Sequence, residues 1–178
     1  MNSNVAFIRG INVGGRNSLT MKQLTEVLED IGSSNIETYI QSGNVLFDSD
    51  LPVNRLSGEI ASEIARRRGF RPEVLVLEKY EFEQAIDNNP FPGESDPQAL
   101  HLGFLKSVPS NPDLKTLEDL RGSNERFELI GRVFYLLAPD GIGRSKLAAK
   151  REKALGVPMT DRNWKTVGRI MAILKARS

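Results

Sequence analysis

Short apolar runs alternate with longer amphipathic segments in the first half of the chain. Residues 5–8 are an apolar run that ends at Arg9-Gly10, which predicts a buried strand. Apolar side chains at helical spacing predict a helix over 21–31, with Thr20 and Gln23 matching a capping box at its start. The same reasoning predicts strands at 35–40, 45–47 and 73–77 and helices at 54–68 and 81–86. The order β-α-β-β-α-β is the ferredoxin-like split βαβ pattern.

The second half of the chain repeats the opening half of this pattern. It follows a segment at 90–97 that is rich in helix breakers and is typical of a linker. Strands are expected at 100–105, 126–130 and 133–137, and helices at 113–120, 145–155 and 162–175. We therefore predict an α+β fold in which a ferredoxin-like unit, residues 1–89, precedes a second related α+β unit with C-terminal helices, residues 98–178. The two are expected as separate domains or as one compact domain.

Composition narrows the classes of function. The chain has 178 residues and a net charge of +1, so it lacks the overall positive charge of a protein that coats nucleic acid. It has no cysteine and one histidine, His101, which we interpret as a core residue. We therefore expect no metal site and no cofactor. No apolar run approaches the ~18 residues of a membrane span, and no signal-peptide pattern is present. These features predict a cytoplasmic protein that does not bind membranes.

Glycine and arginine cluster in the segment 9–17, between the first predicted strand and the first predicted helix. Glycine lets the backbone turn sharply and approach a ligand, and arginine offers a planar fork of donors for carboxylate or phosphate. The candidate ligand-binding residues here are Arg9, Gly10, Asn12, Gly14, Gly15 and Arg16. The alternative is that Arg9 pairs with a carboxylate of the core.

A polar turn at 41–44 is expected beside this loop, because both lie at the same end of the predicted sheet. Gln41, Ser42 and Asn44 offer hydroxyl and amide groups that can orient a ligand. The alternative is that these residues only form the turn.

Two further segments place cations at predicted helix starts, where the helix dipole disfavours them unless an anion is bound. The first contains Arg144, Ser145 and Lys146, and the second contains Arg162, Asn163 and Trp164 after a predicted N-cap at Thr160. The alternative is that the cations are merely solvated and that Trp164 belongs to the core.

The segments 7–15, 39–45, 143–147 and 160–167 together resemble the signatures of domain-of-unknown-function family 1697. The resemblance covers essentially the whole chain and implies an α+β protein of ferredoxin-like units, found mainly in bacteria. It implies no activity and no catalytic residues. Relatives often have lysine at the position of Arg16, which keeps the cation.

Three hypotheses about function remain open at the level of the sequence. The first is a protein that binds a phosphate-bearing ligand, either a small molecule such as a nucleotide or single-stranded nucleic acid. The second is an enzyme, a transferase or hydrolase, acting on a phosphorylated small molecule, which requires the basic segments to converge on one pocket. The third is an interaction module without a small ligand, which requires an exposed apolar patch.

Overall fold

The computed structural model describes residues 1–177, and its chain divides into two compact units. Unit 1 comprises residues 1–84 together with 174–177, and unit 2 comprises Ala85–Ile173. The boundary between them falls inside helix α3, Lys79–Asp87, and again inside helix α6, Trp164–Ala176. The fold is α+β, with a β-α-β-β-α-β unit followed by a second, related unit, as the sequence predicts.

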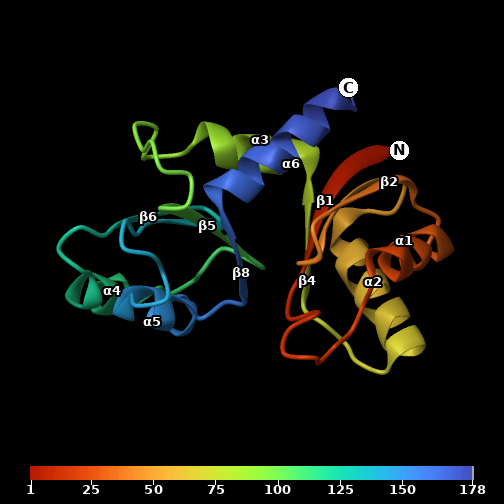
Figure 1. Ribbon diagram of the computed structural model, residues 1–178, viewed down its shortest axis with the longest axis horizontal. Helices are drawn as coiled ribbons and strands as arrows, with labels where there is room; N and C mark the ends of the chain where they lie inside the picture. Colours follow the sequence, from red (N-terminus) through yellow and green to blue (C-terminus); the bar gives the residue numbers. More distant parts are fainter. Residues whose placement is uncertain (178) are drawn as a thin grey trace. The chain divides into compact units, whose positions relative to one another are not determined.

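Unit 1 is a four-stranded antiparallel sheet with two helices on one face (Figure 1). Its elements are β1 (Asn2–Ile8), α1 (Met21–Asp30), β2 (Ser34–Tyr39), β3 (Asn44–Ser49), α2 (Val53–Arg68) and β4 (Val74–Glu78). The strand order β2-β3-β1-β4 puts β1 in the interior of the sheet, hydrogen-bonded along both edges. The helix-covered core is made of alternate strand residues such as Ala6, Ile8 and Phe47, packed against Leu28 and Ile60 of the helices.

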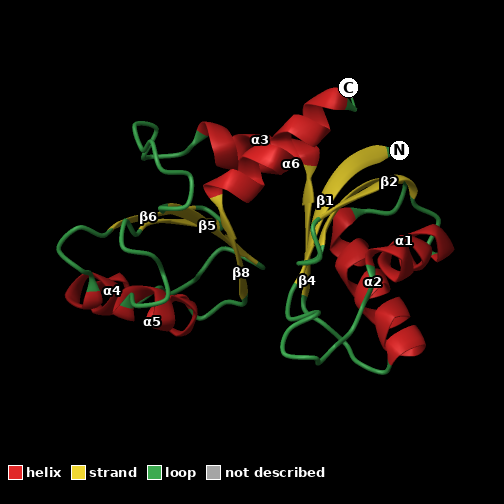
Figure 2. Ribbon diagram, viewed as in Figure 1, coloured by secondary structure: helices red, strands yellow, loops and turns green. Residues whose placement is uncertain are grey.

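Unit 2 repeats this arrangement, with its two helices on one face of a second sheet (Figure 2). Its elements are β5 (Leu100–Leu105), α4 (Leu114–Leu120), β6 (Arg126–Ile130), β7 (Val133–Leu137), α5 (Lys146–Leu155) and β8 (Met159–Asn163). The strand order β6-β7-β5-β8 matches that of unit 1 element by element.

The prediction for residues 159–163 was wrong, because this segment forms strand β8 and not the start of a helix. We expected Thr160 to cap a helix that starts near Arg162, but Met159–Asn163 pairs with β5 and the helix starts at Trp164. The reason is that β5 is buried throughout, so its second edge needs a hydrogen-bonding partner, which the polar sequence of β8 supplies. The cap of α6 is Asn163, whose Oδ1 accepts from the amide of Thr166 at 2.9 Å. Unit 2 therefore contains the whole split βαβ pattern rather than its opening half.

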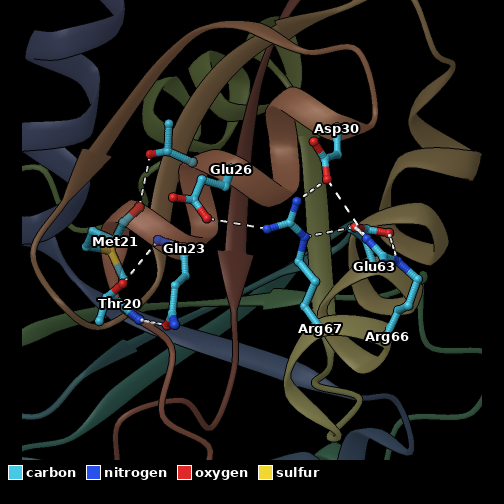
Figure 3. Close-up of polar contacts among 9 residues, drawn as sticks. Thr20, Met21, Gln23, Glu26, Asp30, Glu63, Arg66 and Arg67 are labelled. Atoms are coloured by element: carbon cyan, nitrogen blue, oxygen red, sulfur yellow. Dashed lines mark hydrogen bonds and ion pairs between the residues drawn. The ribbon is translucent and has the colours of Figure 1, made fainter.

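The two helices of unit 1 are joined by an ionic network (Figure 3). Arg67 of α2 donates to Glu26 and Asp30 of α1 and, at 2.9 Å, to Glu63. Arg66 forms a two-pronged contact with the same Glu63, at 3.0 and 2.5 Å. Hydrogen bonds from Arg66 and Arg67 lower the pKa of Glu63 from 4.5 to about 2. The link between α1 and α2 is made by Arg67 with Glu26 and Asp30, and ionised Glu63 binds both arginines on the α2 side of the network.

None of the helices within residues 1–177 is both long enough and apolar enough to cross a membrane.

We predict that Glu63→Gln weakens the fold in a pH-dependent way. Because the folded-state pKa of Glu63 lies below 4.5, its carboxylate stabilises the fold above that pH and loses this effect as the pH falls through about 2. Urea unfolding should show a lower midpoint for the variant than for the natural protein at pH 6. The difference between the two urea midpoints should disappear towards pH 2. Glu59→Gln, which breaks only the pair with Arg55, is the control and should have a smaller effect at pH 6. A gap that is the same at both pH values would contradict this assignment.

Candidate functional site

The loop between β1 and α1 folds as a miniature hairpin. The amide of Asn12 donates to the carbonyl of Asn17 at 3.1 Å, and the amide of Arg16 donates to the carbonyl of Val13 at 3.0 Å. Gly14 and Gly15 form the tip with φ of 58° and 72°, which are the positive values that a type I′ turn requires at both central positions. The glycine pair therefore has a structural role of its own.

The tip of this hairpin also presents backbone donors to solvent. Positive φ recurs at Gly10, Asn12 and Asn17 as well as at the tip, so the backbone reverses direction several times in this short segment. Within residues 1–177, the amides of Gly14 and Gly15 have no hydrogen-bond acceptor. Both residues are exposed, so these two N–H groups can bind an anion from solution.

The structure brings this hairpin against the β2–β3 turn, as the topology predicts. Asn12 makes the connection, since its Nδ2 donates to the carbonyls of Leu19 at 2.8 Å and Gln41 at 3.0 Å, and its Oδ1 accepts from the amide of Leu19. At the base of the turn, the amide of Ile8 donates to the carbonyl of Gly43 at 2.8 Å. The side chain of Asn12 is thus occupied in holding the two segments together.

The polar groups of the turn divide into internal and exposed ones. Asn44 is fully buried, and its Nδ2 donates to the carbonyl of Tyr39 and to Oγ of Ser42. Gln41 and Ser42 are exposed beside the hairpin. Of the three residues expected to orient a ligand, Gln41 and Ser42 are therefore open to solvent, and Asn44 shapes the turn.

Ile40 holds an unfavourable backbone conformation at this site. Its φ is 49°, in the left-handed region that a β-branched side chain rarely adopts, and its side chain is 50% exposed. Such strain is concentrated at functional sites in proteins generally. The alternating pattern of residues 35–40 predicts a strand, and it contains no signal that could have revealed this feature.

Positive charge collects along the hairpin. Arg9 and Arg16 are exposed, and within residues 1–177 the guanidinium of Arg16 has no hydrogen-bond or ion-pair partner. Arg68, at the end of α2, donates from Nε to the carbonyl of Ser18 at 3.1 Å and so adds a cation that the sequence did not identify. Glu73 also touches the loop, where its carbonyl accepts from the amide of Arg9. Three cations, Arg9, Arg16 and Arg68, therefore border the loop.

The predicted residues of unit 2 lie at one end of its sheet. Ser145 is the N-cap of α5, and its Oγ accepts from the amide of Ala148 at 3.0 Å. Arg144 and Lys146 on either side are exposed, with no ion-pair or hydrogen-bond partner for their side chains within residues 1–177. Because β8 runs back along the unit after α5, its last residues return to the end at which α5 starts.

Arg162, Asn163 and Trp164 are less open than expected. Arg162 donates from Nη1 to the carbonyl of Asp161 at 2.8 Å, and burial lowers its pKa to about 10 although the charge of Asp161 opposes this. Asn163 caps α6, and Trp164 is half-buried at the start of that helix. Since Arg162 lies in a strand, the helix-dipole argument for an anion at this residue no longer applies.

A buried polar network, which the sequence did not predict, crosses unit 2. His101 places Nδ1 2.8 Å from Oδ2 of Asp161 and Nε2 3.1 Å from the carbonyl of Gln98. Arg151 of α5 completes the network, because its Nη1 forms an ion pair with Oδ1 of Asp161 at 3.1 Å. The geometry of this ion pair does not meet the criteria for a hydrogen bond. His101 is thus a hydrogen-bonded core residue, as expected, and both of its ring nitrogens face acceptors.

Within residues 1–177, no three histidine, aspartate or glutamate side chains gather as ligands for a metal ion.

Comparison with known proteins places the chain in a family. The family model described as "Protein of unknown function (DUF1697)" matches residues 1–135. The chain belongs to the DUF1697 family. The match includes the hairpin and the β2–β3 turn but ends before Arg144 and the segment that contains Arg162.

One solved structure extends the likeness over the whole fold. The conserved bacterial protein SP0830 from Streptococcus pneumoniae is 25% identical, with a TM-score of 0.70, over 95% of this chain and 96% of that chain. No curated protein matches. Membership in DUF1697 and the similarity to SP0830 thus support the fold and leave the activity to be argued from the site.

We predict that Gly43→Ala destabilises the protein more than an ordinary left-handed glycine would. Gly43 has φ of 81°, and an added Cβ would lie 2.6 Å from the carbonyl oxygen of Ile8. The conformational and steric penalties together amount to about 2–4 kcal/mol in the free energy of unfolding. Gly69→Ala is the control, because Gly69 has φ of 78° but no neighbouring atom within 4 Å of the added Cβ. Equal losses for the two variants in urea unfolding would refute the steric part of the explanation.

We predict that Ile40→Asn stabilises the protein. Asparagine tolerates the left-handed conformation, and the exposed side chain of Ile40 contributes little packing. The free energy of unfolding should rise by about 1 kcal/mol. Ile36→Asn is the comparison and should lower it, because Ile36 packs against the core of unit 1. A loss of stability in Ile40→Asn would show that the Ile40 side chain has a packing role.

Proposed function

We propose that the protein binds a phosphate-bearing ligand at the hairpin Arg9–Asn17 of unit 1. The observation that carries the proposal is the tip of this hairpin, where the amides of Gly14 and Gly15 lack an acceptor within residues 1–177 beside the partnerless guanidinium of Arg16. Backbone amides and an arginine fork are the donors that suit phosphate oxygens.

The surroundings support this choice of ligand class. Arg9 and Arg68 add charge at the two ends of the hairpin, and Gln41 and Ser42 add exposed amide and hydroxyl groups next to it. The hairpin is fixed in place by Asn12 and by the Ile8–Gly43 contact, so little ordering is required when a ligand binds. A nucleotide or sugar phosphate matches these donors. In unit 2, Arg144 and Lys146 are a candidate anion site of their own.

The proposal is tested by a thermal-shift screen of nucleotides, sugar phosphates and inorganic phosphate against the full chain. A ligand at 100 times its Kd should raise the free energy of unfolding by about 2.7 kcal/mol. Arg16→Gln should weaken binding by roughly ten- to a hundredfold in calorimetry, because a charge-assisted hydrogen bond is lost. It should leave the stability of the free protein unchanged, since Arg16 is exposed and unpaired within residues 1–177.

Arg55→Gln is the matched control, because Arg55 is exposed but already paired with Glu59 at 3.0 Å. It removes the same charge from unit 1 and should leave the Kd unchanged. The proposal fails if no phosphate compound shifts the melting temperature, or if both variants bind the ligand as the natural protein does.

A further inference from the structure

The exposed side of α5 carries a row of lysines. Lys146, Lys150 and Lys153 stand at i, i+4 and i+7, so they project from the same face of the helix. All three are exposed, and Arg144 precedes them at the N-terminal end. Within residues 1–177, none of these four side chains has an ion-pair or hydrogen-bond partner. We name Arg144, Lys146, Lys150 and Lys153 the α5 basic face.

In α2, the helix of unit 1 that corresponds to α5, most of the cations form ion pairs with neighbouring carboxylates. α2 occupies the same place in unit 1 as α5 does in unit 2. Three of its four cations are paired with carboxylates: Arg55 with Glu59 at 3.0 Å, Arg66 with Glu63, and Arg67 with Glu26 at 3.4 Å. The fourth, Arg68, donates to the carbonyl of Ser18. The open charge of α5 is therefore a property of its own sequence and not of the architecture.

Within residues 1–177, no acid forms an ion pair with the α5 basic face. On α4, which packs beside α5, Glu118 pairs with Arg121 at 2.9 Å and Asp119 pairs with Lys115 at 3.0 Å. Asp140, in the loop before α5, accepts from Asn124 at 2.7 Å. Arg151 of α5 points inward to Asp161 and takes no part in the exposed row.

We propose that the α5 basic face docks the phosphate backbone of nucleic acid without regard to sequence. A regular row of like charges matches a polymer that carries regularly repeated opposite charges. The three lysines span about 10 Å along the helix, at 1.5 Å per residue, which corresponds to about three phosphates of a duplex strand at 3.4 Å each. This surface belongs to unit 2, whereas the hairpin belongs to unit 1, and the inference goes beyond the function proposed for the hairpin.

The composition of the surface favours nucleic acid over other polyanions. A helix that lies on an anionic membrane needs large apolar side chains beside its cations, and α5 exposes none. Protein interfaces are depleted in lysine and enriched in aromatic residues, whereas the exposed face of α5 adds only Ala149 to its lysines. No aromatic residue lies on α5, so base stacking is not expected and the contacts are limited to phosphates.

The test is fluorescence anisotropy with a labelled 20-base-pair DNA duplex of random sequence, titrated with the full chain at several salt concentrations. If the four cations of the α5 basic face neutralise four phosphates, the logarithm of the binding constant should fall against the logarithm of the salt concentration with a slope of about −3 to −4. The triple variant Lys146→Gln, Lys150→Gln, Lys153→Gln should bind roughly tenfold or more weakly at 50 mM salt and have a slope close to −1. Since all three side chains are exposed and unpaired within residues 1–177, circular dichroism should show an unchanged fold.

The matched control removes the same number of charges elsewhere. Arg55→Gln, Lys79→Gln and Lys115→Gln together change the net charge equally, but each of these cations has a carboxylate partner. This variant should bind DNA as the natural protein does. The inference is overturned if duplex DNA does not bind at 50 mM salt, if both triple variants lose affinity equally, or if vesicles of anionic lipid bind and DNA does not. A loss of DNA affinity in Arg16→Gln that the lysine triple variant does not share would place DNA binding at the hairpin and would also overturn the inference.

Discussion

Each sheet is organised by a buried interior strand whose backbone must be hydrogen-bonded along both edges. β1 meets this requirement with β3 and β4, and β5 meets it with β7 and β8. An unpaired amide or carbonyl in such a position would cost about as much as a lost hydrogen bond. The same requirement applies to the last residue of β1, Ile8, whose amide donates to the carbonyl of Gly43 and thereby holds the β2–β3 turn against the hairpin. The candidate site of unit 1 is therefore a consequence of how the sheet is completed.

Elements with local signals were predictable, and the element that depends on distant partners was not. The capping box of Thr20 and Gln23 starts α1 in the structure, and Gly69 ends α2 in the left-handed conformation. Both features involve residues a few positions apart in the chain. β8 has no apolar alternation, and its sequence is typical of a helix start, so its strand character comes only from the open edge of β5. The rest of the fold class was predictable because its strands and helices carry clear periodicity.

The same distinction applies to the candidate sites. The glycines and arginines of the hairpin were recognisable because backbone freedom and charge are properties of single residues. The contact of Arg68 with Ser18 joins segments 50 residues apart, and the network of Arg151, Asp161 and His101 joins three elements, so neither leaves a pattern in the sequence. The strain at Ile40 likewise arises from the turn that its neighbours impose.

The α5 basic face has an energetic consequence for the helix that bears it. Like charges at i and i+4, as at Lys146 and Lys150, destabilise a helix by about 0.2–0.5 kcal/mol. Lysine beside the N-terminus also opposes the helix dipole. In α2, cations are offset by Glu59 and Glu63, so that helix gains little from an external anion. In α5 the lysines have no ion-pair partner within residues 1–177, so salt or a bound polyanion can relieve the repulsion. Binding of a polyanion to the α5 basic face and stabilisation of α5 are therefore linked. The more lysine charge a bound anion neutralises, the more it raises the stability of the helix.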